Sequence, residues 1–525
     1  MLIPTGADLT AILPTLIMIA WALGLLLAAL FMPKQRQWAN SARLGLIGLG
    51  AALLASVLRW DRPVSGFNAT VSLDNFSLFT HVILILAGML IILLSRHAPA
   101  PVDSVLSTAG RRRSEYHPLL LLSLSGMTLL SSANDLTILF VSLELLSMPL
   151  YILSGFDASS QPPSPLTLTT SPSGTIERSK AGALKHVMLG VFASAFLVYG
   201  IALVYGGAGT TALPKIIQGA MAGDMALVAV GAALILVGLA FKVGAVPFHM
   251  WIPDVYEDAP LPITAFMSVG VKTAGLAALG RLVLVALPSP GEKWTPVVAV
   301  LAALTMTLGD VAAVSQTNIK RMLTYSSIAQ TGYVLMGVAA LSAQRPFGSE
   351  RGSVGLLFSL LVYAFTQLGA FAVLTAMARG KDHANAHRAA TPSREDYDLA
   401  AYAGLAKQQP WLAAAMALFM FSLVGIPATS GFVGKSSLFL AAIEADLTWL
   451  AALGVLTSLI SAFAYLRVVA LMYFKKPPGD VTPHLCPMLR LALVIAAALT
   501  LILGLWPGPV LDLAQDAVRA ILGQM

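Results

Sequence analysis

The chain alternates long apolar runs with short polar stretches along its whole length. A helix needs about 20 mainly apolar residues to cross a bilayer. The apolar runs of this chain are continuous and do not alternate apolar with polar residues, which excludes a membrane β-barrel and predicts an all-α polytopic membrane protein. There are fourteen such runs, which is an even number, so both termini are expected on one side of the membrane. The fourteen runs lie near residues 8–32, 41–60, 74–95, 117–133, 135–156, 179–206, 225–250, 261–287, 295–316, 321–342, 354–379, 410–443, 445–474 and 488–507.

Composition supports this prediction and excludes several kinds of chemistry. Only 57 of 525 side chains are charged (32 Lys and Arg plus 25 Asp and Glu, 11%), and the mean hydropathy is +0.81. A soluble domain carries roughly 25% charged residues. The single cysteine, Cys486, cannot form an internal disulfide, hold an iron–sulfur cluster or build a Cys-type zinc site. With no Walker A, HExxH or CxxCH sequence, we expect no redox cofactor, no metal site and no covalent catalysis in this chain.

The basic residues in the loops predict the direction of the chain. Cytoplasmic loops of membrane proteins carry an excess of Lys and Arg. If the N-terminus faces outward, the inward loops hold 19 such residues and the outward loops and tail hold 8, Arg281 among them. The three longest polar loops, 96–117, 157–178 and 380–408, then all face inward. This distribution predicts outward termini and argues against a basic face for nucleic acid.

Two of the runs are interrupted by glycine and proline. The seventh contains Pro247 in GLAFKVGAVPFHMWIPD, and the twelfth contains Pro427 in FSLVGIPATSGFVGK. Proline removes a helical hydrogen bond, so each helix should break there, and broken spans at matching places in two halves point to a transport site. Both are fourth in a block of five spans, which predicts inverted repeats formed by spans 4–8 and 9–13. The alternative is that two kinked spans match by chance.

These repeats divide the chain into four parts. We expect a three-span segment at 1–116, the first repeat at 117–287, the second at 288–474, and a final span with an amphipathic helix at 475–525. That last helix has apolar residues on one side only. It either lies at the membrane interface or packs on the bundle as a helical cap.

Five ionisable residues lie inside apolar runs, where a charge costs about 2.5–3.5 kcal/mol on insertion scales. Glu144 is in the fifth run and Lys185 in the sixth, and we predict that they form a couple. Lys242, Lys272 and Lys435 lie in the seventh, eighth and twelfth runs. Lysine suits a proton relay because desolvation favours its neutral form and a nearby carboxylate favours its charged form. The alternatives are snorkelling of the lysines to an interface and a packing role for the glutamate.

Other ionisable residues in the runs are weaker candidates. His249 follows the break in the seventh run and either passes protons or supports the kink. Asp310 is either part of a relay or a local partner for Lys320 or Arg321. His186 is a lone histidine, for which packing is the expected role.

Several stretches together resemble a known family. They are LFVSLELLSMPLYILSGF, ALKHVMLGVFASAFLVYGIALVYG, FKVGAVPFHMWIPDVYEDAPLPITAFMSVGVK, QTNIKRMLTYSSIAQTGY and SLVGIPATSGFVGK. The chain resembles the antiporter-like membrane subunits of respiratory complex I, and among them the bacterial subunit N type. The resemblance covers nearly the whole chain.

The resemblance implies roles for the buried residues. Glu144 and Lys185 match the family's fifth- and sixth-span couple, and Lys242, Lys272 and Lys435 match its lysines in spans seven, eight and twelve. It implies proton translocation driven by electron transfer from NADH to quinone, with NADH, FMN, iron–sulfur clusters and quinone bound in other subunits. The implied partners are those membrane and peripheral subunits and lipid, not nucleic acid. The implied location is the bacterial inner membrane, with periplasmic termini.

The sequence departs from the family pattern at several positions. Asp258 stands where the family usually has Gly, Gln330 where many relatives have His, and Asp310 where Asn is common. Gln330 cannot titrate, so a relay through that position is in doubt. Two other functions stay open: a subunit of a multi-subunit cation/proton antiporter, and a structural scaffold with an inactive relay.

Overall fold

The computed structural model describes residues 4–33, 36–95, 115–156, 174–286, 294–343, 350–384, 397–477 and 485–522. The predicted polar loops 96–117 and 157–178 fall largely outside these residues, as do residues 385–396 of the third loop, 380–408.

The N-terminal segment holds three long helices. Its elements are α1 (Gly6–Ala11), α2 (Leu13–Phe31), α3 (Gln37–Leu58), β1 (Val64–Gly66), β2 (Val71–Leu73) and α4 (Asn75–Ser95). The two strands pair antiparallel, with Val64 opposite Leu73. The Asp8 carboxylate caps α1 and accepts the backbone N–H groups of Thr5 and Phe67, and these bonds hold the pKa of Asp8 below its usual value.

The next part of the chain contains the first broken span. Its elements are α6 (Tyr116–Ser131), α7 (Leu136–Ser154), α8 (Gly174–Ala208), α9 (Leu213–Ala222), α10 (Met225–Val243), α11 (Trp251–Asp258), α12 (Leu261–Phe266), the π-helix η3 (Met267–Val271) and α13 (Lys272–Val285). Helix α10 ends at Gly244, which is left-handed with φ +73°. A break at glycine and proline in the seventh run is therefore confirmed.

The second half repeats this plan. Its elements are α14 (Trp294–Ser315), α15 (Ile319–Ala343), α16 (Glu350–Ala384), η6 (Leu399–Tyr402), α17 (Leu405–Gln408), α18 (Pro410–Val424), α19 (Ser430–Glu444), α20 (Thr448–Phe474), α21 (Pro487–Leu505) and α22 (Gly508–Leu522). Helix α18 ends at the left-handed Gly425, with φ +92°, and α19 begins five residues later. The break in the twelfth run is confirmed as well.

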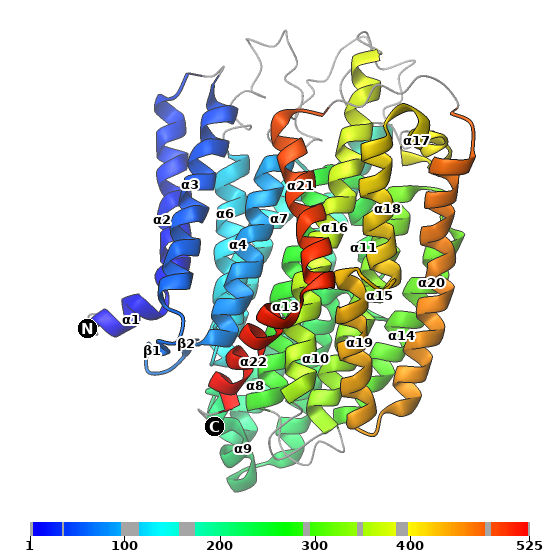
Figure 1. Ribbon diagram of the computed structural model, residues 1–525. Helices are drawn as coiled ribbons and strands as arrows, with labels where there is room; N and C mark the ends of the chain where they lie inside the picture. Colours follow the sequence, from blue (N-terminus) through cyan, green and yellow to red (C-terminus); the bar gives the residue numbers. More distant parts are fainter. Residues whose placement is uncertain are drawn as a thin grey trace.

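The long helices run roughly side by side, and both termini lie at the same end of the bundle (Figure 1). Among the described residues, eleven helices are long and apolar enough to cross a membrane. The other three of the fourteen predicted spans are also helical. The fourth is α6 with 16 residues, and the tenth is α15 with 25. The twelfth is divided into α18 and α19, with 15 residues each. The prediction of an all-α membrane protein with an even number of spans is therefore correct.

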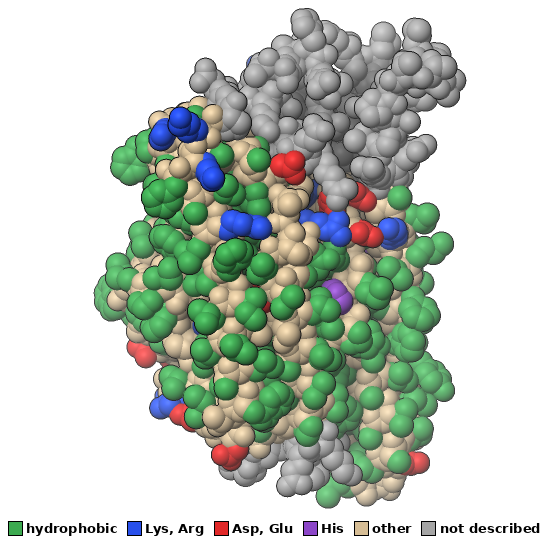
Figure 2. Space-filling model, turned by 90° about the vertical axis from the view of Figure 1, so that its right-hand side faces the viewer, with side chains coloured by type: hydrophobic (Ala, Val, Ile, Leu, Met, Phe, Trp, Pro, Cys, Tyr) green, Lys and Arg blue, Asp and Glu red, His purple; other side chains and the backbone are tan. Residues whose placement is uncertain are grey.

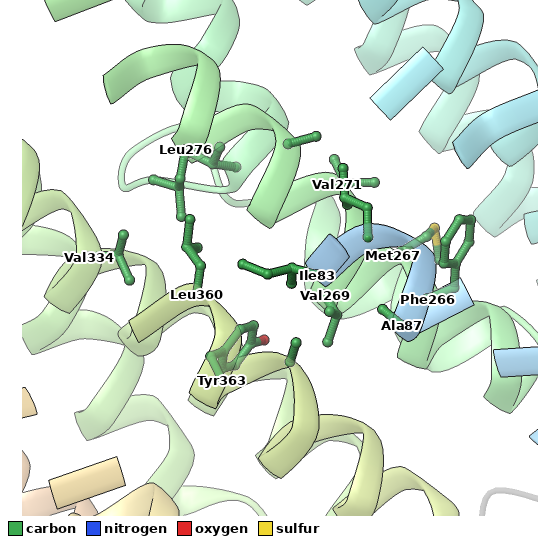
Figure 3. Close-up of a cluster of buried hydrophobic side chains, with 14 of the residues drawn as sticks. Ile83, Ala87, Phe266, Met267, Val269, Val271, Leu276, Val334, Leu360 and Tyr363 are labelled. Carbon is green, nitrogen blue, oxygen red and sulfur yellow. The ribbon is translucent and has the colours of Figure 1, made fainter. Parts of the chain in front are cut away.

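The eighth and eleventh spans form the centre of the bundle. The span from Leu261 to Val285 and the one from Glu350 to Ala378 have membrane-length windows that are completely buried. Figure 3 shows their side chains meeting, with Val269 of η3 and Leu360 of α16 pointing toward Ile83 of α4. Lys272 directly follows η3 and therefore starts from a fully buried segment.

The bundle has an apolar outer surface between two polar ends. Figure 2 shows hydrophobic side chains over the middle of one face and most of the charged ones toward the two ends. In a bilayer such a surface contacts lipid or other apolar surfaces.

Two expectations from the sequence are decided by packing. Arg281 was counted with the outward loops, but it lies inside α13 and is buried, so it is not a topology signal. Helix α22 packs on α4 and α16 through Ala514, Val518 and Ile521. Its Arg519 pairs with Glu350 at 2.8 Å, so α22 is a cap on the bundle.

Candidate functional site

Lys242 forms the centre of the first half. It is the second residue from the end of α10 and is buried. Its Nζ donates to Ser147 Oγ at 2.7 Å and to Tyr151 Oη at 3.2 Å, both on α7, and it lies 5.3 Å from the centroid of the Tyr151 ring. The three groups place an ammonium in a cradle of hydroxyls and an aromatic face.

The break after Lys242 is held by neighbouring side chains. The N–H of Val246 donates to Thr305 Oγ1 at 2.9 Å, and the indole of Trp251 donates to the carbonyl of Phe241 at 3.0 Å. Such partners satisfy backbone groups that an unbroken helix would pair internally. His249 lies within the break, and its Nδ1 has no hydrogen-bond partner among the described residues. The structure therefore leaves both roles of His249 open.

Glu144 and Lys185 do not form the predicted couple. Ser194 of α8 donates to Glu144 Oε1, whereas Lys185 Nζ pairs with Asp254 of α11 at 2.8 Å. Lys185 precedes Ser194 by nine residues, which is about 13 Å along a helix. The predicted direct pairing is wrong, because the register of α7 against α8 places Ser194 at the level of Glu144 and leaves Lys185 elsewhere. Hydropathy does not encode this register.

Lys185 also differs from the other lysines in exposure. Its side chain is 55% exposed and that of Asp254 is 44% exposed, so they form a surface ion pair. The neighbouring His186 is buried, stacked 4.9 Å from the Trp251 ring and set edge-on to Tyr151. This agrees with the expected packing role of His186. Of the five predicted relay residues, Lys185 alone lies at the surface.

Lys272 is fully enclosed in the core. Its Nζ donates to the carbonyl of Ser327 at 2.5 Å and to Ser327 Oγ at 2.8 Å. On the same helix, α15, Thr331 Oγ1 donates to the carbonyl of Ser327 at 3.1 Å and to that of Val243 at 3.2 Å. Helix α15 thus supplies polar groups that join Lys272 to the residue next to Lys242.

Lys435 forms the centre of the second half. It lies on α19 beyond the break, is buried, and donates to Ser458 Oγ at 2.9 Å and to the carbonyl of Val424 at 3.0 Å. That carbonyl belongs to the last residue of α18, which the break leaves available. Lys435 Nζ also lies 4.6 Å from the centroid of the Tyr333 ring.

Asp310 belongs to the Lys435 group. It lies on α14, is only 1% exposed, and its Oδ2 accepts the Tyr333 hydroxyl at 2.7 Å. Lys320 instead donates to the carbonyl of Ala259 at 2.7 Å, and Arg321 pairs with Glu257 at 2.9 Å. The alternative of a local partnership for Asp310 is therefore wrong.

Gln330 lies on α15 between Ser327, which bonds Lys272, and Tyr333, whose ring lies next to Lys435. It lines a cavity of about 20 Å³ together with Lys435. That is room for about one water molecule. Earlier on the same helix, Ser326 bonds the Tyr465 hydroxyl of α20 at 2.5 Å. Separate polar groups thus surround Glu144, each buried lysine and Asp310, and we call this series of groups the polar line.

The hydroxyl partners of the lysines were not predicted from the sequence. Ser147 and Tyr151 lie four residues apart on α7, so they share a face three and seven residues beyond Glu144. That spacing was the available signal. Across the described residues, no group of three or more His, Cys, Asp or Glu side chains is arranged to hold a metal ion.

Comparisons with known proteins agree with this architecture. The family described as NADH:quinone oxidoreductase/Mrp antiporter, TM, matches residues 133–461. The NADH-quinone oxidoreductase subunit N of Trichlorobacter lovleyi is 41% identical over 522 residues, 98% of each chain. That of Chloroflexus aggregans is 41% identical over 523 residues, again 98% of each chain.

Solved structures give the same picture. A chain of respiratory complex I from Thermus thermophilus has a TM-score of 0.76 and 32% identity, covering 96% of this chain and 99% of that one. A chain of the Mrp complex from a Dietzia species has a TM-score of 0.79 and 22% identity, with 98% of both chains covered, and shares the fold. The sequence identities to subunit N over nearly full length decide between these neighbours. The chain belongs to the NADH-quinone oxidoreductase subunit N family.

Proposed function

We propose that this chain translocates protons as a membrane subunit of NADH-quinone oxidoreductase, through the polar line from Glu144 to Asp310. The observation that carries the proposal is the enclosure of Lys242, Lys272 and Lys435, each bonded to hydroxyl or carbonyl groups of another helix. Ionisable groups at membrane depth are costly and mark ion or proton pathways.

Lysine chemistry fits such a pathway. Desolvation favours the neutral amine, and a carboxylate close by favours the ammonium form. Glu144 lies one turn before Ser147, the hydroxyl that accepts from Lys242. A change in the position or charge of Glu144 therefore alters whether Lys242 keeps its proton. Lys185, as a surface residue of the same half, is the point where protons exchange with the aqueous side.

The remaining features of the assembly follow from family membership. We place the redox cofactors and the quinone in other subunits and none in this chain. We keep the division into 1–116, 117–287, 288–474 and 475–525, with both termini on the periplasmic side of the inner membrane and lipid on the apolar surface. The loop charges support this orientation, since 7 outward basic residues remain after Arg281 is removed from the 8.

The test uses inside-out membrane vesicles containing the whole complex. Lys242→Met should lower NADH-driven proton uptake by roughly tenfold or more, because a positioned proton-transfer group contributes about 10²–10⁴-fold. Lys242→Arg should lower it as strongly, since arginine keeps its charge but does not release its proton. NADH oxidation by ferricyanide, which reports the peripheral part of the complex, should be unchanged.

Lys215→Met is the matched control, because Lys215 is an exposed lysine on α9. It should pump as the unmodified complex does. Full proton uptake in Lys242→Arg would show that the site needs only a cation and would refute the relay.

The antiporter alternative has a different prediction. An antiporter subunit has no NADH-oxidising partner, so purification in mild detergent would recover the chain without flavin and iron–sulfur subunits. The 41% identity to subunit N favours their recovery, whereas the 22% identity to the Mrp chain carries only the fold.

A further inference from the structure

The second half of the bundle contains an acid that the repeat pattern does not predict. Asp310 lies on α14, the first helix of its five-span block, whereas Glu144 lies on α7, the second helix of the other block. An alignment of the two blocks therefore does not pair these carboxylates. In space, however, each half has a buried lysine beside a tyrosine ring, with the tyrosines on α7 and α15, the second helix of each block.

We propose, on the basis of the proposed function, that Asp310 is the proton acceptor for Lys435 and that Tyr333 connects them. Tyr333 Oη donates to Asp310 Oδ2 at 2.7 Å and also lies 3.1 Å from Thr457 Oγ1. Lys435 Nζ is 4.6 Å from the centroid of the same ring. The tyrosine therefore contacts both ionisable groups at once.

The proton balance of this unit is simple. One N–H bond of the Lys435 ammonium breaks as one O–H bond forms at the Asp310 carboxylate. Tyr333 positions both groups, the ammonium against its ring and the carboxylate at its hydroxyl, and keeps its own proton. The ion pair becomes a neutral amine and a neutral acid, with the total charge unchanged. Conservation of charge matters, because an unbalanced charge in a dry interior costs several kcal/mol.

Packing holds the acid in this position. Helices α14 and α15 are in close contact beside it, and a Cβ added to Gly309 would lie 2.5 Å from the backbone nitrogen of Ala329. Asp310 is 1% exposed, so bulk water does not screen it. A carboxylate buried this deeply needs a cation or a proton. Lys435 is the buried cation of this group, since it lies against the ring of the tyrosine whose hydroxyl bonds Asp310.

This arrangement explains how a chain with Gln330 keeps a titratable group next to Lys435. Gln330 lies one turn before Tyr333 on α15 and lines the Lys435 cavity, but its amide does not titrate. Asp310 supplies the acid from α14, at the hydroxyl of Tyr333. A histidine at 330 would restore a proton acceptor on the Gln330 side.

The experiment compares complexes with Asp310→Asn, Lys435→Met and both changes in inside-out vesicles. Asp310→Asn keeps the shape of the side chain and an oxygen for Tyr333. We expect each single change to lower proton uptake by roughly tenfold or more. The double variant should be no worse than either single one, because both remove the same step. Asp446→Asn, at an exposed carboxylate of the same half, is the control and should pump normally.

A purely structural role for Asp310 is separated by rescue. Gln330→His in the Asp310→Asn background should recover most of the proton uptake, since it returns a titratable group to the Lys435 cavity. Undiminished pumping in Asp310→Asn, additive losses in the double variant, or failure of the rescue would each overturn the proposal. If Lys242→Met and Lys435→Met also pump normally, the proposed function itself fails. If only Asp310→Asn does, that function stands and this inference alone falls.

Discussion

The buried ion pair between Asp74 and Arg281 allows a sharp test of how the N-terminal segment is attached. Arg281 on α13 donates through Nη2 to both carboxylate oxygens of Asp74, at 2.7 and 2.8 Å, and the two side chains are 3% and 0% exposed. The residues are 207 positions apart, so the pair fixes the start of α4 to the first repeat. Removing one partner of such a pair costs about 3–5 kcal/mol, because the other charge stays buried and unpaired.

In the variant Asp74→Asn, the charge of Arg281 stays buried without its carboxylate partner. A loss of about 3–5 kcal/mol raises the fraction of opened molecules by roughly 10²- to 10⁴-fold. Replacing both residues, as in Asp74→Asn with Arg281→Met, removes both charges and should recover a large part of the loss. The double variant is therefore predicted to be more stable than Asp74→Asn.

The single cysteine provides the assay. Cys486 is buried at the start of α21, which packs against α4, and its sulfur accepts the N–H of Leu489 at 3.4 Å. Alkylation of Cys486 in the intact complex, followed by mass spectrometry of its peptide, reports the opening of this chain alone. Opening that is rapid compared with alkylation gives a rate proportional to the opened fraction.

The control is Arg351→Met, which breaks the exposed ion pair with Glu444. An exposed pair contributes about 0–1 kcal/mol, so alkylation should change by less than roughly tenfold. If Asp74→Asn labels no faster than Arg351→Met, or if the double variant labels as fast as Asp74→Asn, the argument from burial is refuted.

Three further predictions concern packing and the lysines. Tyr151→Phe removes a hydroxyl that accepts from Lys242 and should destabilise the chain by about 1–3 kcal/mol, measured by the same alkylation assay. Gly332→Ala sets a Cβ 2.5 Å from a backbone nitrogen of α14 and should cost about 1–3 kcal/mol, whereas Gly50→Ala, whose nearest atom is 3.8 Å away, should be neutral; equal effects would contradict the close-packing argument. Lys185→Met breaks only a surface ion pair, so thermal stability should change by less than about 1 kcal/mol, and a larger loss would show that the pair is not solvated.

Hydropathy predicted the spans because the bilayer leaves the chain few alternatives. A crossing segment must satisfy its own backbone, so each long apolar run becomes a helix. The breaks at Gly244 and Gly425 were foreseen for a similar reason, since proline follows each of them within three residues. The sequence also predicted Lys242, Lys272 and Lys435 at membrane depth, with snorkelling as the alternative, and the structure shows that all three are buried.

The partners of these groups could not be predicted in the same way. Which residues of two adjacent helices meet depends on their register and rotation, and small shifts change both. The pairing of Glu144 with Ser194 rather than Lys185 is one example, and that of Asp310 with Tyr333 is another. Close approach at Gly190 of α8 to α7 and at Gly309 of α14 to α15 accompanies these pairings.

The π-helix η3 makes the direction of Lys272 depend on one residue. A π-turn accommodates one more residue than the α-helical turn that it replaces. Deleting one residue from Met267–Val271 would let α12 and α13 join as a regular α-helix and would turn everything after it by about 100°. Lys272 would then point away from Ser327, with no change in its chemistry. The number of residues before Lys272, as much as the lysine itself, determines which helix its side chain contacts.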